Sequence, residues 1–127
     1  MTPELAALLA AIGFAVIAVF QVGIALGAPL GRGAWGGAHT VLPRNLRAAS
    51  AVAAVIWLVA ALVVLDRAGT PIADMPDVVS YWITWALAIL LPVGALMNFA
   101  SSSPYERFAW GPLALVLAVL TLILALS

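Results

Sequence analysis

Residues 5–28 read LAALLAAIGFAVIAVFQVGIALGA and contain no charged side chain. A helix that crosses a bilayer needs about 20 consecutive apolar residues, so this stretch is long enough to span one. It differs from a secretory signal peptide, because Glu4 is the only charge before Arg32 and the apolar run exceeds the roughly 7–15 residues of a signal core. We therefore predict a retained membrane helix over residues 5–28.

Three further apolar stretches follow, at residues 43–65, 75–100 and 104–126. They are apolar all round, as helices in lipid are, and they lack the alternation over about 10 residues that marks membrane strands. The sequence predicts an all-α membrane protein, in which four transmembrane helices form two tandem helical hairpins of one antiparallel bundle. This bundle makes up a single domain over residues 1–127.

Two of the helix starts carry capping signals. Asp74 is the predicted N-cap of the third helix, and Ser103 with Glu106 reads as a capping box for the fourth. A glycine–proline pair inside the fourth stretch leaves two alternatives. Either the helix is continuous and bent, or a short interfacial helix precedes the span. We favour the continuous, bent helix.

The composition fits a bilayer better than it fits water. The chain is 66% hydrophobic and 8% charged, with a mean hydropathy of +1.21, whereas a soluble domain is about 45–50% apolar and about 25% charged. No cysteine is present, which excludes disulfides and thiolate chemistry. The formal net charge is zero and no lysine occurs, so attraction to nucleic acid has no basis. No cofactor is predicted.

The charged residues divide unevenly between the two ends of the predicted bundle. The end with the first and third connections has a net charge of +3, from Arg32, Arg44, Arg47, Arg107 and Glu106. The other end has a net charge of −3, from Arg67, Glu4, Asp66, Asp74 and Asp77. Cytoplasmic loops are enriched in arginine and lysine. We therefore predict a multi-pass protein of the cell membrane, with the first and third connections in the cytoplasm and both termini outside.

These two connections carry the same pattern, P-x-x-R-x-A-W-G, at residues 29–36 and 104–111. Arginine binds phosphate headgroups or helix-end carbonyls, and tryptophan suits the membrane interface. The pattern therefore predicts a duplicated interfacial anchor and turn. The alternative is a pseudo-symmetric site over an anionic ligand or lipid headgroup. Its residues would be Arg32, Trp35, Arg107 and Trp110.

Other polar side chains are expected near the same end. Gln21 and Asn98 come late in their helices and should hydrogen-bond between helices; alternatively, they line a small polar pocket with His39 and the two motif arginines. His39 is the only histidine, and we expect it to be structural. Proton transfer, with Glu106 as its partner, is the alternative. No second histidine or thiol stands at ligand spacing, so no metal site is predicted.

Small residues indicate where the first helix packs. The spacing Gly23-x-x-x-Gly27 lets two membrane helices approach closely. We expect this face to serve either packing inside the bundle or a homodimer, and the sequence leaves both open.

Two runs of the chain carry a resemblance to known proteins. Residues 35–47 read W-G-G-x-H-x-V-L-P-x-x-L-R, and residues 101–107 read S-x-x-P-x-E-R. In these runs the chain resembles small bacterial four-helix integral membrane proteins of uncharacterised function. The resemblance covers most of the chain. It implies the four-helix architecture and no particular activity.

Three functions are compatible with these features. The one we favour is a non-catalytic membrane module, either an accessory subunit or an envelope or lipid-interacting scaffold. Its partner would be the lipid bilayer, with assembly as a homo-oligomer or within a larger membrane complex. The first alternative is a small transporter or channel, monomeric or dimeric, with a polar site near the cytoplasmic face. The absence of ionisable side chains from the middle of the spans weakens it. The second is a lipid- or quinone-linked membrane enzyme.

Overall fold

The computed structural model describes residues 1–127 and contains no strand. Its long helices are α1 (Pro3–Ala25), α2 (Arg44–Arg67), α3 (Asp77–Phe99) and α4 (Gly111–Leu126), the last preceded by the π-helical turn η3 (Glu106–Trp110). Each is long and apolar enough to cross a membrane, with η3 counted as part of the fourth span. The predicted all-α fold with four transmembrane helices is confirmed, and the chain has the architecture of a multi-pass membrane protein.

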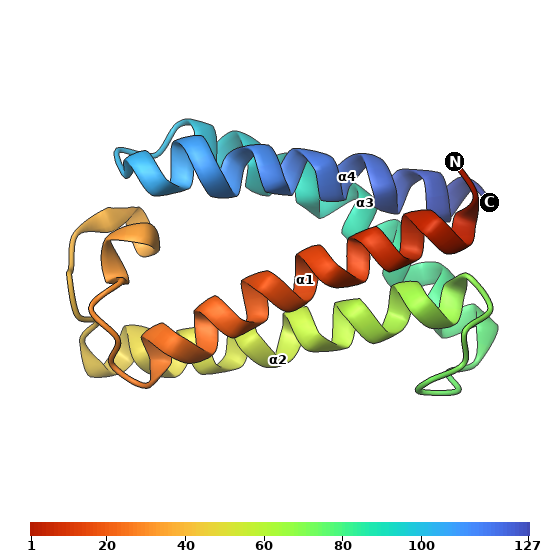
Figure 1. Ribbon diagram of the computed structural model, residues 1–127, viewed down its shortest axis with the longest axis horizontal. Helices are drawn as coiled ribbons and strands as arrows, with labels where there is room; N and C mark the ends of the chain where they lie inside the picture. The colour runs from red at the N-terminus through yellow and green to blue at the C-terminus, as the bar shows by residue number, and fades with distance from the viewer.

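The helices pair as two antiparallel hairpins, α1 with α2 and α3 with α4 (Figure 1). α1 also contacts α4, and α2 contacts α3, which joins the hairpins into one bundle. The α1–α2 and α3–α4 connections lie at one end, which we call the motif end (Figure 1). Both termini and the α2–α3 connection lie at the opposite end, which we call the terminal end. The two copies of the repeated pattern therefore share one end of the bundle, as predicted.

A packed core fills mainly the half of the bundle nearest the terminal end. In lipid, helices gain little from hydrophobic attraction, so close packing of small residues holds them together. α1 supplies alanines that let the leucines of α4 approach. A Cβ placed on Gly13 would lie only 2.8 Å from the Leu117 side chain. The core consists of Ala6, Ala7, Ala10, Ala11, Phe14, Ala60, Val64, Leu91, Leu117, Ala118, Leu120 and Leu124.

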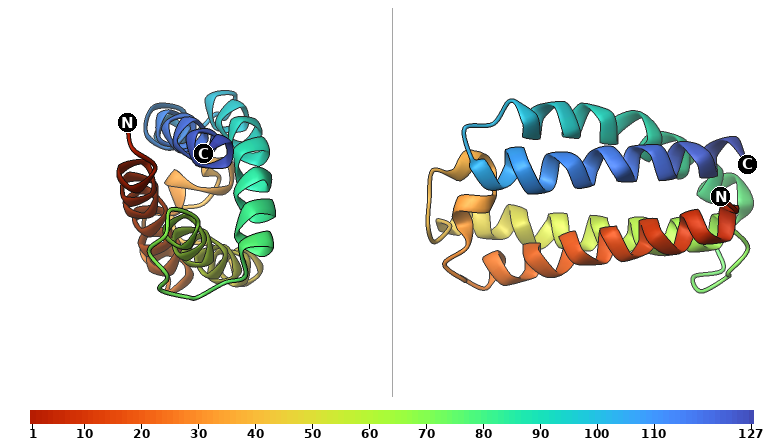
Figure 2. Two further views of the ribbon diagram at one scale, coloured as in Figure 1. Left: turned by 90° about the vertical axis from the view of Figure 1, so that its right-hand side faces the viewer. Right: turned by 45° about the horizontal axis from the view of Figure 1, so that its top comes forward.

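The two hairpins diverge toward the motif end, and part of the α1–α2 connection lies between them (Figures 1 and 2). This part, residues 31–37, forms the 3-10 turns η1 (Gly31–Gly33) and η2 (Trp35–Gly37). We call it the plug segment. A small apolar cluster holds the connection against the end of α1. The cluster consists of Ile24, Ala34 and Leu42.

α1 ends at Ala25, three residues before its predicted end at Ala28. Gly27 stops the helix because it has a left-handed φ of +99°, and the Ala28 N–H donates to the Gly23 carbonyl at 3.0 Å. The prediction that Gly23 and Gly27 form a face that packs inside the bundle is therefore wrong. Gly27 lies outside α1, next to the Arg47 guanidinium, and a Cβ placed on Gly23 would meet open space.

α3 begins two residues later than predicted, at Asp77 instead of Met75, and Asp74 is not its cap. The N-cap position is occupied by Pro76, while Asp74 has a φ of +51° in the preceding loop. A residue that precedes proline is disfavoured in the helical conformation, so the helix starts only after Pro76. α2 runs two residues past its predicted end, to Arg67.

Residues 104–126 form one continuous helix, as predicted, with the π-helical turn η3 between its first turn and α4. Ser103 caps this helix, because its Oγ accepts a hydrogen bond from the Glu106 N–H at 3.4 Å. The reciprocal half of the predicted capping box is wrong, because the Glu106 carboxylate binds other partners.

Candidate functional site

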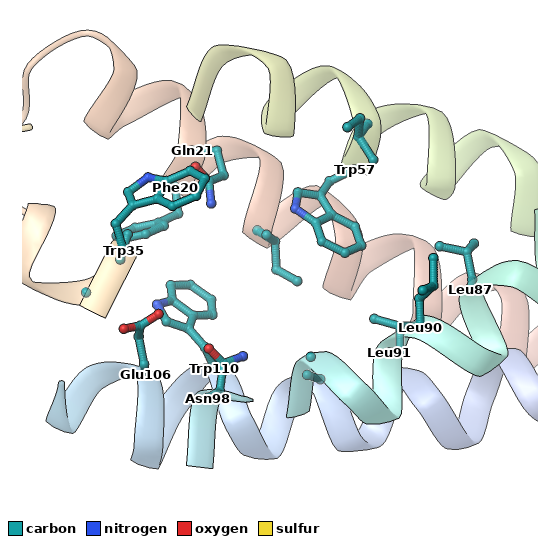
Figure 3. Close-up of a pocket in the computed structure, with 16 residues that line it drawn as sticks. Phe20, Gln21, Trp35, Trp57, Leu87, Leu90, Leu91, Asn98, Glu106 and Trp110 are labelled. Atoms are coloured by element: carbon teal, nitrogen blue, oxygen red, sulfur yellow. The ribbon is translucent and has the colours of Figure 1, made fainter. Parts of the chain in front are cut away.

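A cavity of about 320 Å³ lies between the two hairpins, bordered at the motif end by the plug segment (Figure 3). All four long helices and η3 also contribute to its walls. Sites for small molecules commonly have volumes of about 300–1,000 Å³, so the cavity is large enough to hold part of a ligand. Five residues singled out from the sequence line it, namely Gln21, Trp35, Asn98, Glu106 and Trp110.

Four aromatic side chains line the cavity. Phe20 and Trp110 come from different hairpins, and their ring centroids lie 4.8 Å apart with the planes at 47°. Trp57 stacks on the core residue Phe14 at 5.6 Å and 10°, which fixes its ring beside the packed half of the bundle. Trp35 comes from the plug segment. The cavity is therefore bounded by aromatic surfaces from four separate elements of the chain.

The plug segment is held in an unusual backbone conformation. Trp35, Gly36 and Gly37 have φ values of +51°, +81° and +78°. A tryptophan rarely adopts a positive φ, and such a conformation persists only where its surroundings determine it. The Trp35 indole N–H donates to the hydroxyl of Ser50 on α2 at 2.9 Å, and Ser50 is fully buried. This bond fixes the indole at the edge of the cavity.

Glu106 joins the two connections at the motif end. Its Oε1 accepts hydrogen bonds from the Gly36 N–H at 2.9 Å and from the Ser101 hydroxyl at 2.8 Å. A second link is made by Ser103, whose hydroxyl donates to the Arg32 carbonyl at 2.6 Å. The carboxylate thus holds the plug segment to the second hairpin instead of capping its own helix.

Polar groups inside the cavity lack partners in the chain. The Gln21 Oε1 is buried and accepts no hydrogen bond. Asn98 faces the same cavity from α3, and the two amides are not joined to each other. The predicted interhelical hydrogen bonds are therefore not formed. Gln21 and Asn98 both line the cavity, but its lining is mostly apolar and includes neither His39 nor the motif arginines, with which the alternative prediction grouped them.

The cavity opens sideways between α2 and α3. At its rim, Ile56 on α2 is 55% exposed and Leu90 on α3 is 63% exposed. By contrast, none of the lining residues on α1 or α4 is exposed. Exposed apolar side chains of a spanning helix face acyl chains, so in a bilayer this side of the cavity would lie against lipid.

The two motif arginines serve the connections rather than a common ligand. Arg32 donates to the Thr40 hydroxyl at 3.2 Å and to the Gly37 carbonyl at 2.9 Å. Arg107 donates to the Ser101 carbonyl, with the shorter bond at 2.9 Å. The pseudo-symmetric site is therefore only half formed, because both motif tryptophans line the cavity and neither arginine does.

A second cavity, of about 200 Å³, lies next to the first and shares Phe20, Gly33 and Trp110 with it. Arg32 and Tyr105 line this second cavity from the two connections. Its only charged lining residue is thus an arginine, whereas that of the first cavity is Glu106.

His39 stands apart from both cavities. It is partly exposed, lines neither of them and makes no side-chain hydrogen bond. The predicted alternative of an acid–base pair between His39 and Glu106 is not formed, because the carboxylate binds Gly36 and Ser101. A pocket shared by Gln21, Asn98, His39 and both motif arginines is likewise not formed.

Several residues of the site carry no signal in the sequence. Trp57 faces the cavity from the middle of α2, and Gly94 faces it from the last third of α3, where a small residue is ordinary in a membrane helix. Ser50 stands in a row of alanines and reads as a packing residue, although it fixes Trp35. Their role follows only from the divergence of the hairpins.

Comparisons with known protein families, with curated proteins and with solved structures find no match for this chain. The class is therefore defined by the physical arrangement, which is that of a four-helix membrane protein with a laterally open, aromatic-lined cavity at one end.

Proposed function

We propose that the protein is a non-catalytic, lipid-interacting membrane module that takes part of an amphiphile from the surrounding leaflet into the cavity between its hairpins. The lateral opening between α2 and α3 carries this proposal, because a molecule in the acyl layer can enter there without crossing water. The unpartnered amides of Gln21 and Asn98 support it. The Gln21 Oε1 is the buried one of these groups. A buried acceptor without a partner costs about 1–3 kcal/mol, and a bound headgroup would offset that cost.

The geometry gives less support to the alternatives. The packed core closes the terminal half of the bundle, so the cavity is a pocket rather than a path across the membrane. An enzyme that uses His39 with Glu106 would need the two side chains together, and they have different surroundings. A role as an accessory subunit or envelope scaffold needs neither a path nor a reacting pair. The resemblance to small bacterial four-helix membrane proteins stays a prediction.

We also propose that the motif end faces the cytoplasm of a cell membrane, with both termini outside. The support comes from the charges, because four arginines lie at the motif end and one at the terminal end. Cytoplasmic loops carry the excess of arginine and lysine. In this orientation the cavity opens into the cytoplasmic leaflet.

A cavity-filling variant tests the binding function. Gly94 lines the cavity, and a Cβ at this position meets nothing within 4 Å, so Gly94→Phe adds a ring at the cavity wall without backbone crowding at its Cβ. The neighbouring Val93→Phe is the matched control, because Val93 is 51% exposed and does not line the cavity. Binding is measured in lipid nanodiscs as energy transfer from tryptophan to a dansyl-labelled alkyl chain.

We expect saturable transfer for the wild type and for Val93→Phe, and an affinity at least about tenfold lower for Gly94→Phe, a clear margin on the free-energy scale of binding. Transfer that rises without saturation, equally in all three proteins, would show only partition into the bilayer and would overturn the proposal.

A further inference from the structure

We propose that the headgroup bound in this cavity is a protonated amine, so that the ligand is an amphiphile with an ammonium group and an apolar tail. This inference rests on the proposed function and specifies its ligand. Three observations point to it, namely the charge of the cavity, its aromatic surfaces and the position of its unpartnered amides.

The charge comes from one carboxylate. Glu106 is the only ionisable side chain that lines the cavity. Its Oε1 accepts two hydrogen bonds from the chain, whereas its second oxygen accepts none. The nearest motif arginines make their hydrogen bonds within the connections, Arg32 to Thr40 and Gly37 and Arg107 to Ser101. Arg32 keeps its charge in the neighbouring cavity, whereas the charged side chain that lines this cavity is a carboxylate, which attracts a cation and repels an anion.

The aromatic surfaces favour the same charge. Phe20, Trp35, Trp57 and Trp110 surround the cavity, and Trp110 stands one helical turn from Glu106. The face of an indole or phenyl ring attracts cations, most strongly where water is excluded. A carboxylate flanked by such faces suits an ammonium group better than it suits a neutral hydroxyl.

The polar and apolar parts of the cavity are separated along its length. Figure 3 shows Gln21, Asn98 and Glu106 near the motif end, and Trp57, Leu87, Leu90 and Leu91 further along. An ammonium N–H would satisfy the free oxygen of the Glu106 carboxylate. The unpartnered amide oxygen of Gln21 lies across the cavity from it (Figure 3). The tail would then lie among the leucines and leave through the opening beside Leu90.

The test compares headgroups on one chain length. Dodecylammonium, dodecanol and dodecanoate compete with the dansyl probe in nanodiscs of zwitterionic lipid, and each affinity is corrected for partition into nanodiscs without protein. A lysophosphatidylethanolamine of the same chain length distinguishes a phospholipid source of the amine from a free lipophilic amine. Glu106→Gln removes the charge while its amide oxygen can still accept from Gly36 and Ser101. Ser102→Ala is the control for a loosened connection, because its hydroxyl donates to the Gly36 carbonyl.

We expect dodecylammonium to bind at least about tenfold more tightly than dodecanol, as an ion pair and cation–π contacts away from water allow. Glu106→Gln should abolish this preference for the amine over the alcohol, and Ser102→Ala should retain it. Equal binding of amine and alcohol with saturation intact would overturn this inference and leave the proposed function standing. A probe that shows no saturable binding at all would overturn the proposed function itself.

Discussion

Trp35 illustrates how a single residue combines two roles. The sequence indicates an interfacial anchor, and the residue is indeed 44% exposed at the motif end. Its indole N–H is nevertheless turned toward Ser50 of α2, while its backbone has a positive φ. In the second copy, Trp110 has helical backbone angles at the end of the π-helical turn η3, and its ring pairs with Phe20. The tryptophans of the two copies therefore line the same cavity with different backbone conformations, and the repeated sequence pattern does not distinguish the two conformations.

The bond from Trp35 to Ser50 gives a prediction at this scale. We expect Ser50→Ala to lower the free energy of unfolding by about 0.5–1.5 kcal/mol, because the Trp35 indole N–H loses its hydrogen bond to a buried hydroxyl. An SDS titration in mixed micelles measures this change. Ser102→Ala removes a longer bond of 3.3 Å at the surface and should change stability by less than about 0.5 kcal/mol. Equal effects of the two substitutions would show that the hydroxyl of Ser50 does not hold Trp35.

At the scale of the elements, the helices could be predicted because the bilayer sets their length and excludes unpaired backbone groups. The helix ends could not be predicted to the residue. α1 ends before Gly27, which has a positive φ, and α3 begins only after Pro76. The cavity could be predicted only in part. Gln21 and Asn98 are visible as rare polar residues in apolar helices, whereas the space between them depends on how the alanines of α1 meet α4 and on the plug segment.

The packing of α1 gives a second prediction, in which two glycines of one helix are compared. Gly13→Leu should destabilise the fold by at least about 1–3 kcal/mol, because its Cβ would already lie 2.8 Å from Leu117. Gly23→Leu should stay within about 0.5 kcal/mol, since its Cβ meets open space. Unfolding in SDS measures both. A large loss of monomer stability in Gly23→Leu would contradict the assignment of an open face to this part of α1.

Gly23 retains one of the roles expected from the sequence, that of a contact between two copies of the chain. We propose this role because the position faces away from the bundle. Light scattering of the Gly23→Leu variant in detergent tests it, and a mass unchanged from a dimeric wild type would exclude Gly23 from the interface.

At the scale of the whole molecule, the bundle has two unlike ends. The motif end is arginine-rich and hollow, and the terminal end is acid-rich and packed. The separation of charge was predictable from the sequence because the number of spans fixes which connections lie together. The separation of hollow and packed halves was not, because it arises from tertiary contacts between hairpins.

The proposed orientation gives the third prediction. The chain has no cysteine, so single cysteines report accessibility without background. Val41→Cys lies in the α1–α2 connection and Ile72→Cys in the α2–α3 connection, and both positions are more than half exposed. A membrane-impermeant maleimide added to intact cells should label Ile72→Cys and spare Val41→Cys, with the opposite result in inverted vesicles. The reverse pattern would place the motif end outside, and labelling of both in each preparation would indicate mixed insertion.

The restriction of the cavity to one half of the bundle has a consequence for transbilayer asymmetry. The cavity extends from the motif end to the middle of the helices, so a molecule resident in the opposite monolayer faces the packed half of the bundle and must first reach the bilayer centre. Occupancy would therefore follow the composition of a single monolayer, and its response to a ligand supplied from the other side would be limited by the rate at which that ligand flips across the membrane.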